Sequence, residues 1–106
     1  MQSIGCSALA RYDVYDNPAE GALLLDIQAD LLSELSSRVV VPLIPKSEHK
    51  QAERLNPVFC VGDEDWVMLT QYLSAVPKSV LKNKVGNLDE EHDKIVAALD
   101  MLFQGF

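Results

Sequence analysis

Basic side chains are scarce in this sequence, which has nine Lys and Arg against sixteen Asp and Glu and a formal net charge of -7. Generic binding to nucleic acid depends on a basic surface that releases the counterions of the phosphates. The deficit therefore argues against a protein that binds nucleic acid by charge alone, and it favours a cationic protein surface as partner.

Long apolar runs are also missing. No run approaches the roughly 18 residues that a membrane-spanning helix needs. The chain does not open on a charged and then apolar leader of the secretory kind. We therefore expect no membrane segment and a cytoplasmic location.

Cysteine is rare, with Cys6 and Cys60 as the two examples, which do not make a disulfide framework. Cys60 lies within an apolar strand pattern, so we expect a buried and inert thiol there. No spacing typical of a metal site is present, and we expect no cofactor.

The 106 residues are enough for one domain with a modest core, which a partner subunit would help to stabilise. Residues 1–9 show no hydrophobic period, and we interpret them as a disordered N-terminal extension. The ordered domain is expected over residues 10–106.

Strand patterns dominate the first part of this domain. Alternation in residues 11–16 and 22–28 predicts a hairpin, in which Leu23, Leu25 and Ile27 face the core while Asp26 and Gln28 face the other way. The β-branched run 37–45 predicts a strand buried on both faces. Its proline, Pro42, should then lie at an edge or a bulge, because it cannot donate to a ladder.

A second hairpin is predicted from the apolar runs 57–61 and 66–73, which flank a four-residue loop at 62–65. Further along, residues 79–81 predict a short strand, and Gly86 with Asn87 predicts a turn.

The clearest element is a C-terminal helix with Asp89 as its N-cap and acidic residues in its first turn. Its apolar stripe consists of Ile95, Leu99, Leu102 and Phe106, widened by Val96 and Phe103. Short antiparallel strands followed by one helix predict an α+β protein or a small barrel with the helix packed against it.

The end of this helix, DMLFQGF at residues 100–106, departs from ordinary preferences. Helix C-termini favour cations, yet the last basic residue is Lys94 and Asp100 adds negative charge. Two phenylalanines, Phe103 and Phe106, bracket Gly105. They are expected either to pack on the helix's own core, the default for Phe103, or to anchor a partner with a basic, apolar pocket.

Several ordered blocks resemble one known family over residues 11–106. These blocks are LLLDIQADLL, VVVPLIP, NPVFCVGDEDWVML, SAVPKSVL and ALDMLFQGF. The sequence resembles the CcdB toxins of bacterial toxin–antitoxin pairs. The most specific piece is the Gly-Asp-Glu-x-Trp turn together with the downstream Val-Pro-x-Ser-Val.

The resemblance implies a small SH3-like antiparallel β-barrel of the CcdB/Kid/MazF type with a C-terminal α-helix, assembled as a homodimer. It implies a toxin that catalyses nothing and poisons DNA gyrase by inserting between the two GyrA arms and trapping cleaved DNA. A CcdA-like antitoxin would extract the toxin, and operator DNA would be bound only by the toxin–antitoxin complex, which represses its own operon.

The family's gyrase contact is usually Phe-Trp-Gly-Ile, and this sequence matches that motif at two positions and departs from it at two. The corresponding residues are Phe103, Gln104, Gly105 and Phe106. A family Asn implicated in poisoning corresponds to Asp100, and the antitoxin-facing Ile-Ile pair corresponds to Leu31 and Leu32.

Gln104 removes an indole that is expected to stack on a gyrase arginine, and such a contact is worth about 0.5–2 kcal/mol. The sequence therefore leaves open an alternative. A CcdB-like protein with blunted or lost gyrase poisoning could retain antitoxin binding and operon autoregulation.

A third hypothesis is an enzyme, because the same barrel carries the Kid- and MazF-like endoribonucleases. The candidate residues are Lys46, His49, Lys50 and Arg54. A lone histidine in a charged loop is more often solvated than catalytic. The net acidity also weighs against an RNA-binding groove.

Overall fold

The computed structural model describes residues 10–105 except 18–20, 30–31, 33–34 and 49–52. The predicted extension at residues 1–9 lies outside the described residues. So do Leu31, His49, Lys50 and Phe106.

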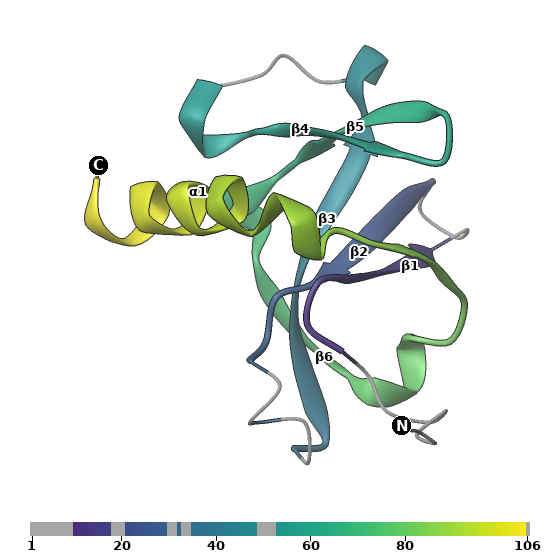
Figure 1. Ribbon diagram of the computed structural model, residues 1–106. Helices are drawn as coiled ribbons and strands as arrows, with labels where there is room; N and C mark the ends of the chain where they lie inside the picture. The colour runs from purple at the N-terminus through teal and green to yellow at the C-terminus, as the bar shows by residue number, and fades with distance from the viewer. Residues whose placement is uncertain (1–9, 18–20, 30–31, 33–34, 49–52, 106) are drawn as a thin grey trace.

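The described residues form a single antiparallel sheet and one α-helix (Figure 1). The strands are β1 Asp13–Asn17, β2 Ala22–Asp26, β3 Ser37–Pro45, β4 Val58–Val61, β5 Glu64–Met68, β6 Ser74–Pro77 and β7 Lys84–Asn87. Their order is β4-β5-β3-β2-β1-β7, and β6 pairs with β3 beside β5. The predicted β1–β2 hairpin and the predicted strand 37–45 are confirmed.

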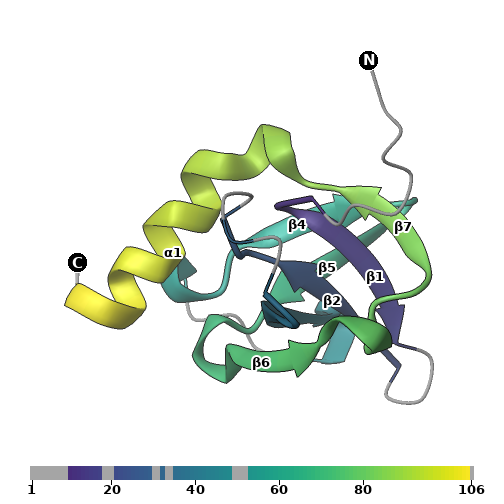
Figure 2. The same ribbon diagram turned by 90° about the horizontal axis from the view of Figure 1, so that it is seen from below.

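The two edge strands of this order, β4 and β7, curl toward each other. A Cβ added to Gly86 of β7 would lie 3.6 Å from Cγ1 of Val61 in β4, and Figure 2 shows the two strands on the same side of the molecule. The sheet is therefore a curled half-barrel. Together with the C-terminal helix it confirms the predicted α+β barrel of the CcdB type.

The helix α1, His92–Gln104, follows a 3₁₀ turn at Asp89–Glu91. Ile95 and Ala98 are fully buried and join the main core, whose other members include Val14, Leu25 and Phe59. The helix packs against the 3₁₀ turns η4, Glu53–Leu55, and η5, Thr70–Tyr72. Along the stripe, Ile95 is buried, Leu99 and Leu102 are half-buried, and Phe103 is exposed.

The predicted N-cap at Asp89 is wrong. Asp89 lies inside the 3₁₀ turn, and its backbone N–H donates to Oδ1 of Asn87 at 2.7 Å. An Asn or Asp side chain commonly accepts a hydrogen bond from the backbone N–H two residues later in the chain. The Asn87 side chain therefore satisfies the first N–H of the 3₁₀ turn, while α1 itself has Glu91 at its N-cap position without a side-chain cap.

Pro42 is located in the central strand rather than at a sheet edge or bulge, and this corrects the prediction. β3 pairs with β6 through residues 37–40 and with β5 through residues 43–45, so Pro42 falls where the partner changes. Its carbonyl oxygen accepts from the N–H of Leu69 at 2.9 Å. The missing N–H of proline costs no ladder hydrogen bond at this junction.

Three local predictions in the second half of the chain are also wrong. Residues 78–80 form a 3₁₀ turn, η6 Lys78–Val80, after β6, and Gly86 with Asn87 lies in β7. The β4–β5 hairpin has a two-residue turn in which Gly62 has φ +65°. A glycine suits the first central position of such a tight turn. The loop is therefore two residues long instead of the expected four.

Cys60 is exposed, which contradicts the expected buried thiol. Strand alternation places its neighbour Phe59 in the core at 1% exposure. Because β4 is an edge strand of a curled sheet, its second face is open to solvent, and Cys60 lies on that face.

Candidate partner-binding surface

The last turns of α1 extend past the sheet, as Figure 1 shows. Asp100, Phe103 and Gln104 are exposed there, and the Phe103 side chain is 69% exposed. Gly105 closes the helix in the left-handed region with φ +80°, and its N–H donates to the Met101 carbonyl at 3.0 Å. This is the usual glycine C-cap of a helix.

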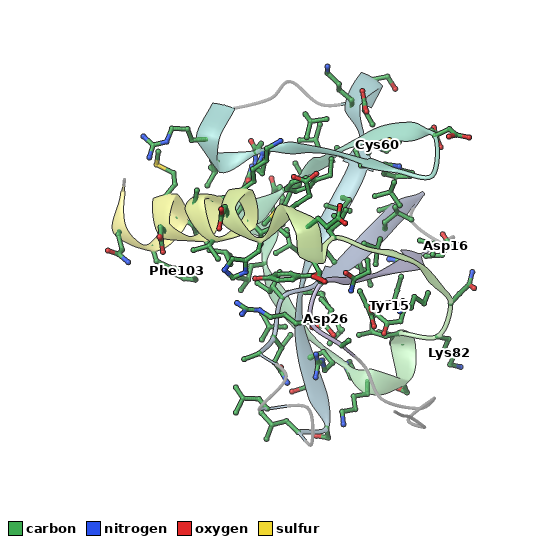
Figure 3. The ribbon with its side chains drawn as sticks, in the orientation of Figure 1. Tyr15, Asp16, Asp26, Cys60, Lys82 and Phe103 are labelled. Atoms are coloured by element: carbon green, nitrogen blue, oxygen red, sulfur yellow. The ribbon has the colours of Figure 1, made fainter. Side chains whose placement is uncertain are left out.

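The default expectation that Phe103 packs on the core of its own protomer is wrong. Phe103 follows the buried Ile95 by eight residues, which turns it about 80° away from the buried side of the helix. Figure 3 shows its ring at the free end of the helix, away from the sheet. Leu102 remains half-buried, so the boundary between core and surface falls between these two neighbours.

Of the predicted antitoxin-facing pair, the structure describes Leu32, which is 49% exposed. It lies in the segment between β2 and β3, where Leu35 is exposed as well. Its predicted companion, Leu31, lies outside the described residues.

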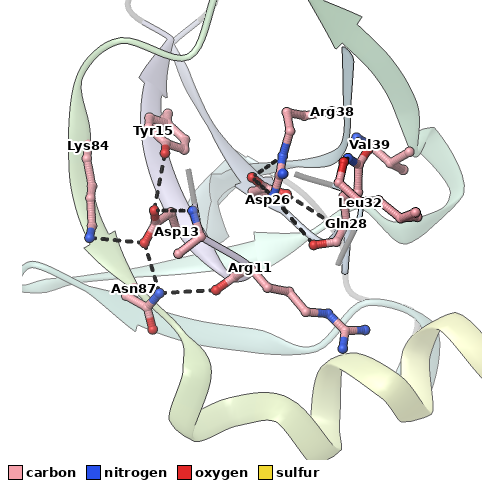
Figure 4. Close-up of polar contacts among 11 residues, drawn as sticks. Arg11, Asp13, Tyr15, Asp26, Gln28, Leu32, Arg38, Val39, Lys84 and Asn87 are labelled. Carbon is pink, nitrogen blue, oxygen red and sulfur yellow. Dashed lines mark hydrogen bonds and ion pairs between the residues drawn. The ribbon is translucent and has the colours of Figure 1, made fainter. Parts of the chain in front are cut away.

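The backbone of Leu32 is tied to the sheet by Gln28. The Nε2 group of Gln28 donates to the Leu32 carbonyl at 2.8 Å, while its Oε1 accepts from the Val39 N–H at 3.1 Å (Figure 4). Gln28 itself is buried. A buried amide with both ends satisfied holds the start of this segment in one position relative to β3.

A buried ion pair between Arg38 and Asp26 holds Gln28 in place. Arg38 donates from Nε to Oδ2 of Asp26 at 2.8 Å, its Nη2 lies 2.7 Å from the same oxygen, and both side chains are fully buried. The other oxygen, Oδ1 of Asp26, accepts from the Gln28 N–H at 3.0 Å. Asp26, Gln28 and Arg38 therefore form one network, drawn in Figure 4.

Sequence reasoning missed this network because it placed Asp26 and Gln28 on the solvent face of their strand. Both faces of β2 are in fact covered. Leu25 belongs to the main core, whereas Leu24 packs against a second cluster of Tyr15, Val40 and Leu81. The available signal was Arg38 at the start of a β-branched run, where an unpaired charge would be very costly.

Asp26 should titrate above the ordinary aspartate value of about 3.9. Burial raises the pKa of Asp26 more than the hydrogen bonds from Arg38 and the Gln28 N–H lower it. Between the ordinary and the raised value the folded state binds more protons than the unfolded state. The contribution of Asp26 to the free energy of unfolding therefore falls as pH rises through that window.

The carboxyl ¹³C chemical shift of Asp26, followed by NMR during an acid titration, measures this directly. We expect a midpoint above the ordinary aspartate value. A midpoint below it would mean that the guanidinium outweighs burial.

A second buried carboxylate, Asp13, joins β1 to β7. It accepts from the Tyr15 hydroxyl at 3.2 Å and from Nδ2 of Asn87 at 2.9 Å, and Nζ of Lys84 lies 3.0 Å away. Burial, followed by the nearby charge of Asp13, raises the pKa of Tyr15. Since its oxygens are occupied by groups of the fold itself, we interpret Asp13 as structural.

Of the four candidate residues for RNA cleavage, the structure describes Lys46 and Arg54. Lys46 and Arg54 are both exposed, and the hollow beside Lys46 is also lined by Glu64 and Asp65. In the described part of the chain no three His, Cys, Asp or Glu side chains are placed to hold a metal ion. Nor does that part contain a helix long and apolar enough to cross a membrane.

The described residues thus define a small barrel protein that exposes a helix end and an apolar segment. A model of the CcdB protein family matches residues 11–105, nearly the whole chain. The chain therefore belongs to the CcdB family. Its class is that of a toxin from a toxin–antitoxin system.

Proposed function

We propose that this protein is the toxin of a type II toxin–antitoxin pair, that it poisons DNA gyrase through residues 100–106, and that a CcdA-like antitoxin neutralises it. It would act in the cytoplasm as an inhibitor of the topoisomerase and not as a catalyst. The observation that carries the proposal is Phe103, which is 69% exposed on a helix end that extends beyond the sheet.

The chemistry of this helix end supports a protein partner. A large aromatic side chain exposed beside a glycine cap can enter a pocket of another protein, and residues of this kind dominate binding energies. The exposed carboxylate of Asp100 would suit a cationic partner surface. Gln104 is also exposed and can hydrogen-bond to that surface.

The remaining partners follow from the same assignment. The toxin would work as a homodimer that engages the GyrA subunit of DNA gyrase. Leu31 and Leu32 would contact the antitoxin, for which the exposure of Leu32 gives support. Operator DNA would be bound only by the toxin–antitoxin complex, which accords with a net charge of -7 on the toxin alone.

Induced expression in bacteria with wild-type gyrase tests this proposal. Without an antitoxin, we expect loss of viability together with accumulation of gyrase-linked DNA breaks. Coexpression of a CcdA-like antitoxin that binds the protein should restore growth. Harmless accumulation of folded protein would contradict gyrase poisoning.

A specific observation favours the second candidate, a CcdB-like protein with blunted poisoning. Position 104 presents an exposed glutamine, which offers no flat apolar face to a guanidinium. If this is the defect, Gln104→Trp should raise the affinity for a GyrA fragment about tenfold to a hundredfold. Calorimetric titration measures the gain.

Unchanged affinity in Gln104→Trp would mean that the helix end addresses a different surface. Asn83→Trp is the matched control, because Asn83 is also an exposed amide and lies between η6 and β7, next to Lys82, which Figure 3 shows on the opposite side of the molecule from Phe103. It should leave the affinity unchanged.

A further inference from the structure

A groove of about 380 Å³ crosses the sheet face that lies opposite the main core. Its floor comes from Leu24 of β2 and Pro42 of β3, and its walls include Tyr72, Val76 and Val80. The groove does not include any residue of the helix end or of the segment that carries Leu32.

The groove exists because β3 changes partners at Pro42. Along one edge, β3 pairs with β6 up to residue 40 and with β5 from residue 43. Between β5 and β6 the chain leaves the sheet through η5. Leu69, the residue just before η5, still donates its backbone N–H to the Pro42 carbonyl at 2.9 Å. A short stretch of apolar sheet therefore stays uncovered.

Two large apolar side chains remain exposed on the walls. Tyr72 of η5 is 61% exposed and Val80 of η6 is 48% exposed. The adjacent Leu81 is 5% exposed and packs with Tyr15 and Val40, which fixes η6 in place and keeps Val80 at the groove. Exposed apolar groups gathered at a concave site are typical of a binding surface.

The chain segment that supplies Tyr72, Val76 and Val80 to the groove walls has the opposite charge to the whole protein. The segment from residue 66 to residue 88 has no Asp or Glu, although the chain has sixteen, and it contains Lys78, Lys82 and Lys84. Lys84 is paired with Asp13. Lys78 and Lys82 flank Val80, and in the described part of the chain neither takes part in an ion pair.

The described lining residues include no acid to offset these lysines. Asn17 lines the groove at the end of β1, and its neighbour Asp16 points to the opposite face because side chains alternate along a strand. Apolar walls, together with two lysines that lie within two residues of Val80 in the chain, suit a ligand that combines apolar side chains with carboxylates.

From this geometry we propose that the groove binds a peptide segment of a partner protein that carries apolar residues together with Asp or Glu. Apolar side chains of the segment lie over Leu24 and Pro42, between Tyr72 and Val80. Its carboxylates face Lys78 and Lys82. The site is separate from residues 100–106, so it does not depend on gyrase binding.

Selection of random peptides displayed on phage against the purified protein tests this site. We expect enriched peptides to be acidic and apolar. When synthesised, they should bind at least about tenfold more weakly to Val80→Asp, and also to the double variant Lys78→Glu/Lys82→Glu. Higher salt should weaken their binding.

Val85→Asp is the matched control, because Val85 is 43% exposed on β7 and does not line the groove. It and Phe103→Ala should leave peptide binding unchanged. Thermal unfolding should show that every variant is folded.

Enrichment of basic peptides, or binding that is indifferent to Val80→Asp, would overturn the proposal. So would sedimentation showing that Val80→Asp converts a dimer to a monomer while peptide binding persists, because the groove would then be a contact between copies.

Discussion

Phe103→Ala should abolish growth inhibition while the protein stays folded. A buried aromatic hot spot at an interface is worth about 2 kcal/mol or more, so gyrase binding should weaken at least about thirtyfold. Because the side chain is 69% exposed in the free protein, its removal should change the free energy of unfolding by no more than about 0.5 kcal/mol. Growth assays and urea denaturation measure the two effects.

The matched control for this variant is Val85→Ala, which truncates another exposed apolar side chain on β7. It should remain toxic. If Phe103→Ala stays as toxic as the wild type at equal expression, the helix end is not the poisoning surface. If Phe103→Ala instead loses stability, Phe103 packs within the assembled protein.

Breaking the buried ion pair should have the largest effect on stability. Removing one partner of such a pair costs about 3–5 kcal/mol, which for a domain of this size lowers the melting temperature by about 4 °C or more per kcal/mol. Asp26→Leu should be worse than Arg38→Met. In Arg38→Met the remaining carboxyl can take up a proton, whereas in Asp26→Leu the guanidinium cannot lose one.

The double variant Asp26→Leu/Arg38→Met shows what the two residues contribute together as an ion pair. It should recover much of the loss, because apolar replacement of a buried ion pair is often nearly neutral. Guanidinium denaturation of the four proteins gives the coupling energy between the two residues. Additive effects in this cycle would show that the charges do not depend on each other.

The regular elements of this fold could be predicted because each has a strong local signal. The β-branched run at residues 37–45 is long enough to be a strand in any context, and it forms β3. The helix has a clear period of 3.6, and Ile95 is buried as the period requires. The β1–β2 hairpin follows from two alternating runs and a turn-rich link.

The curvature of the sheet could not be read from alternation alone. A period of two separates the faces of a strand but does not say whether the second face is covered. In β2 both faces are buried, so Asp26 is inside. In the edge strand β4 one face is open, so Cys60 is outside.

The candidate site was located by the resemblance to a family, while its geometry required the structure. Gln104 and Phe103 could be placed on the helix from the sequence. Whether Phe103 was core or surface depended on how far the rest of the fold reaches along the helix, which a period of 3.6 does not tell. The groove beside Pro42 had no sequence signal, because it arises where β3 exchanges one partner strand for another.

The central claim is that residues 100–106 contact gyrase, and direct binding tests it most closely. Purified protein should be titrated against the purified arm region of GyrA by calorimetry, with Phe103→Ala in parallel. The account predicts saturable binding by the wild type and a loss of at least about thirtyfold in the variant. Absence of binding by folded wild type, or equal affinity of the two proteins, would contradict it.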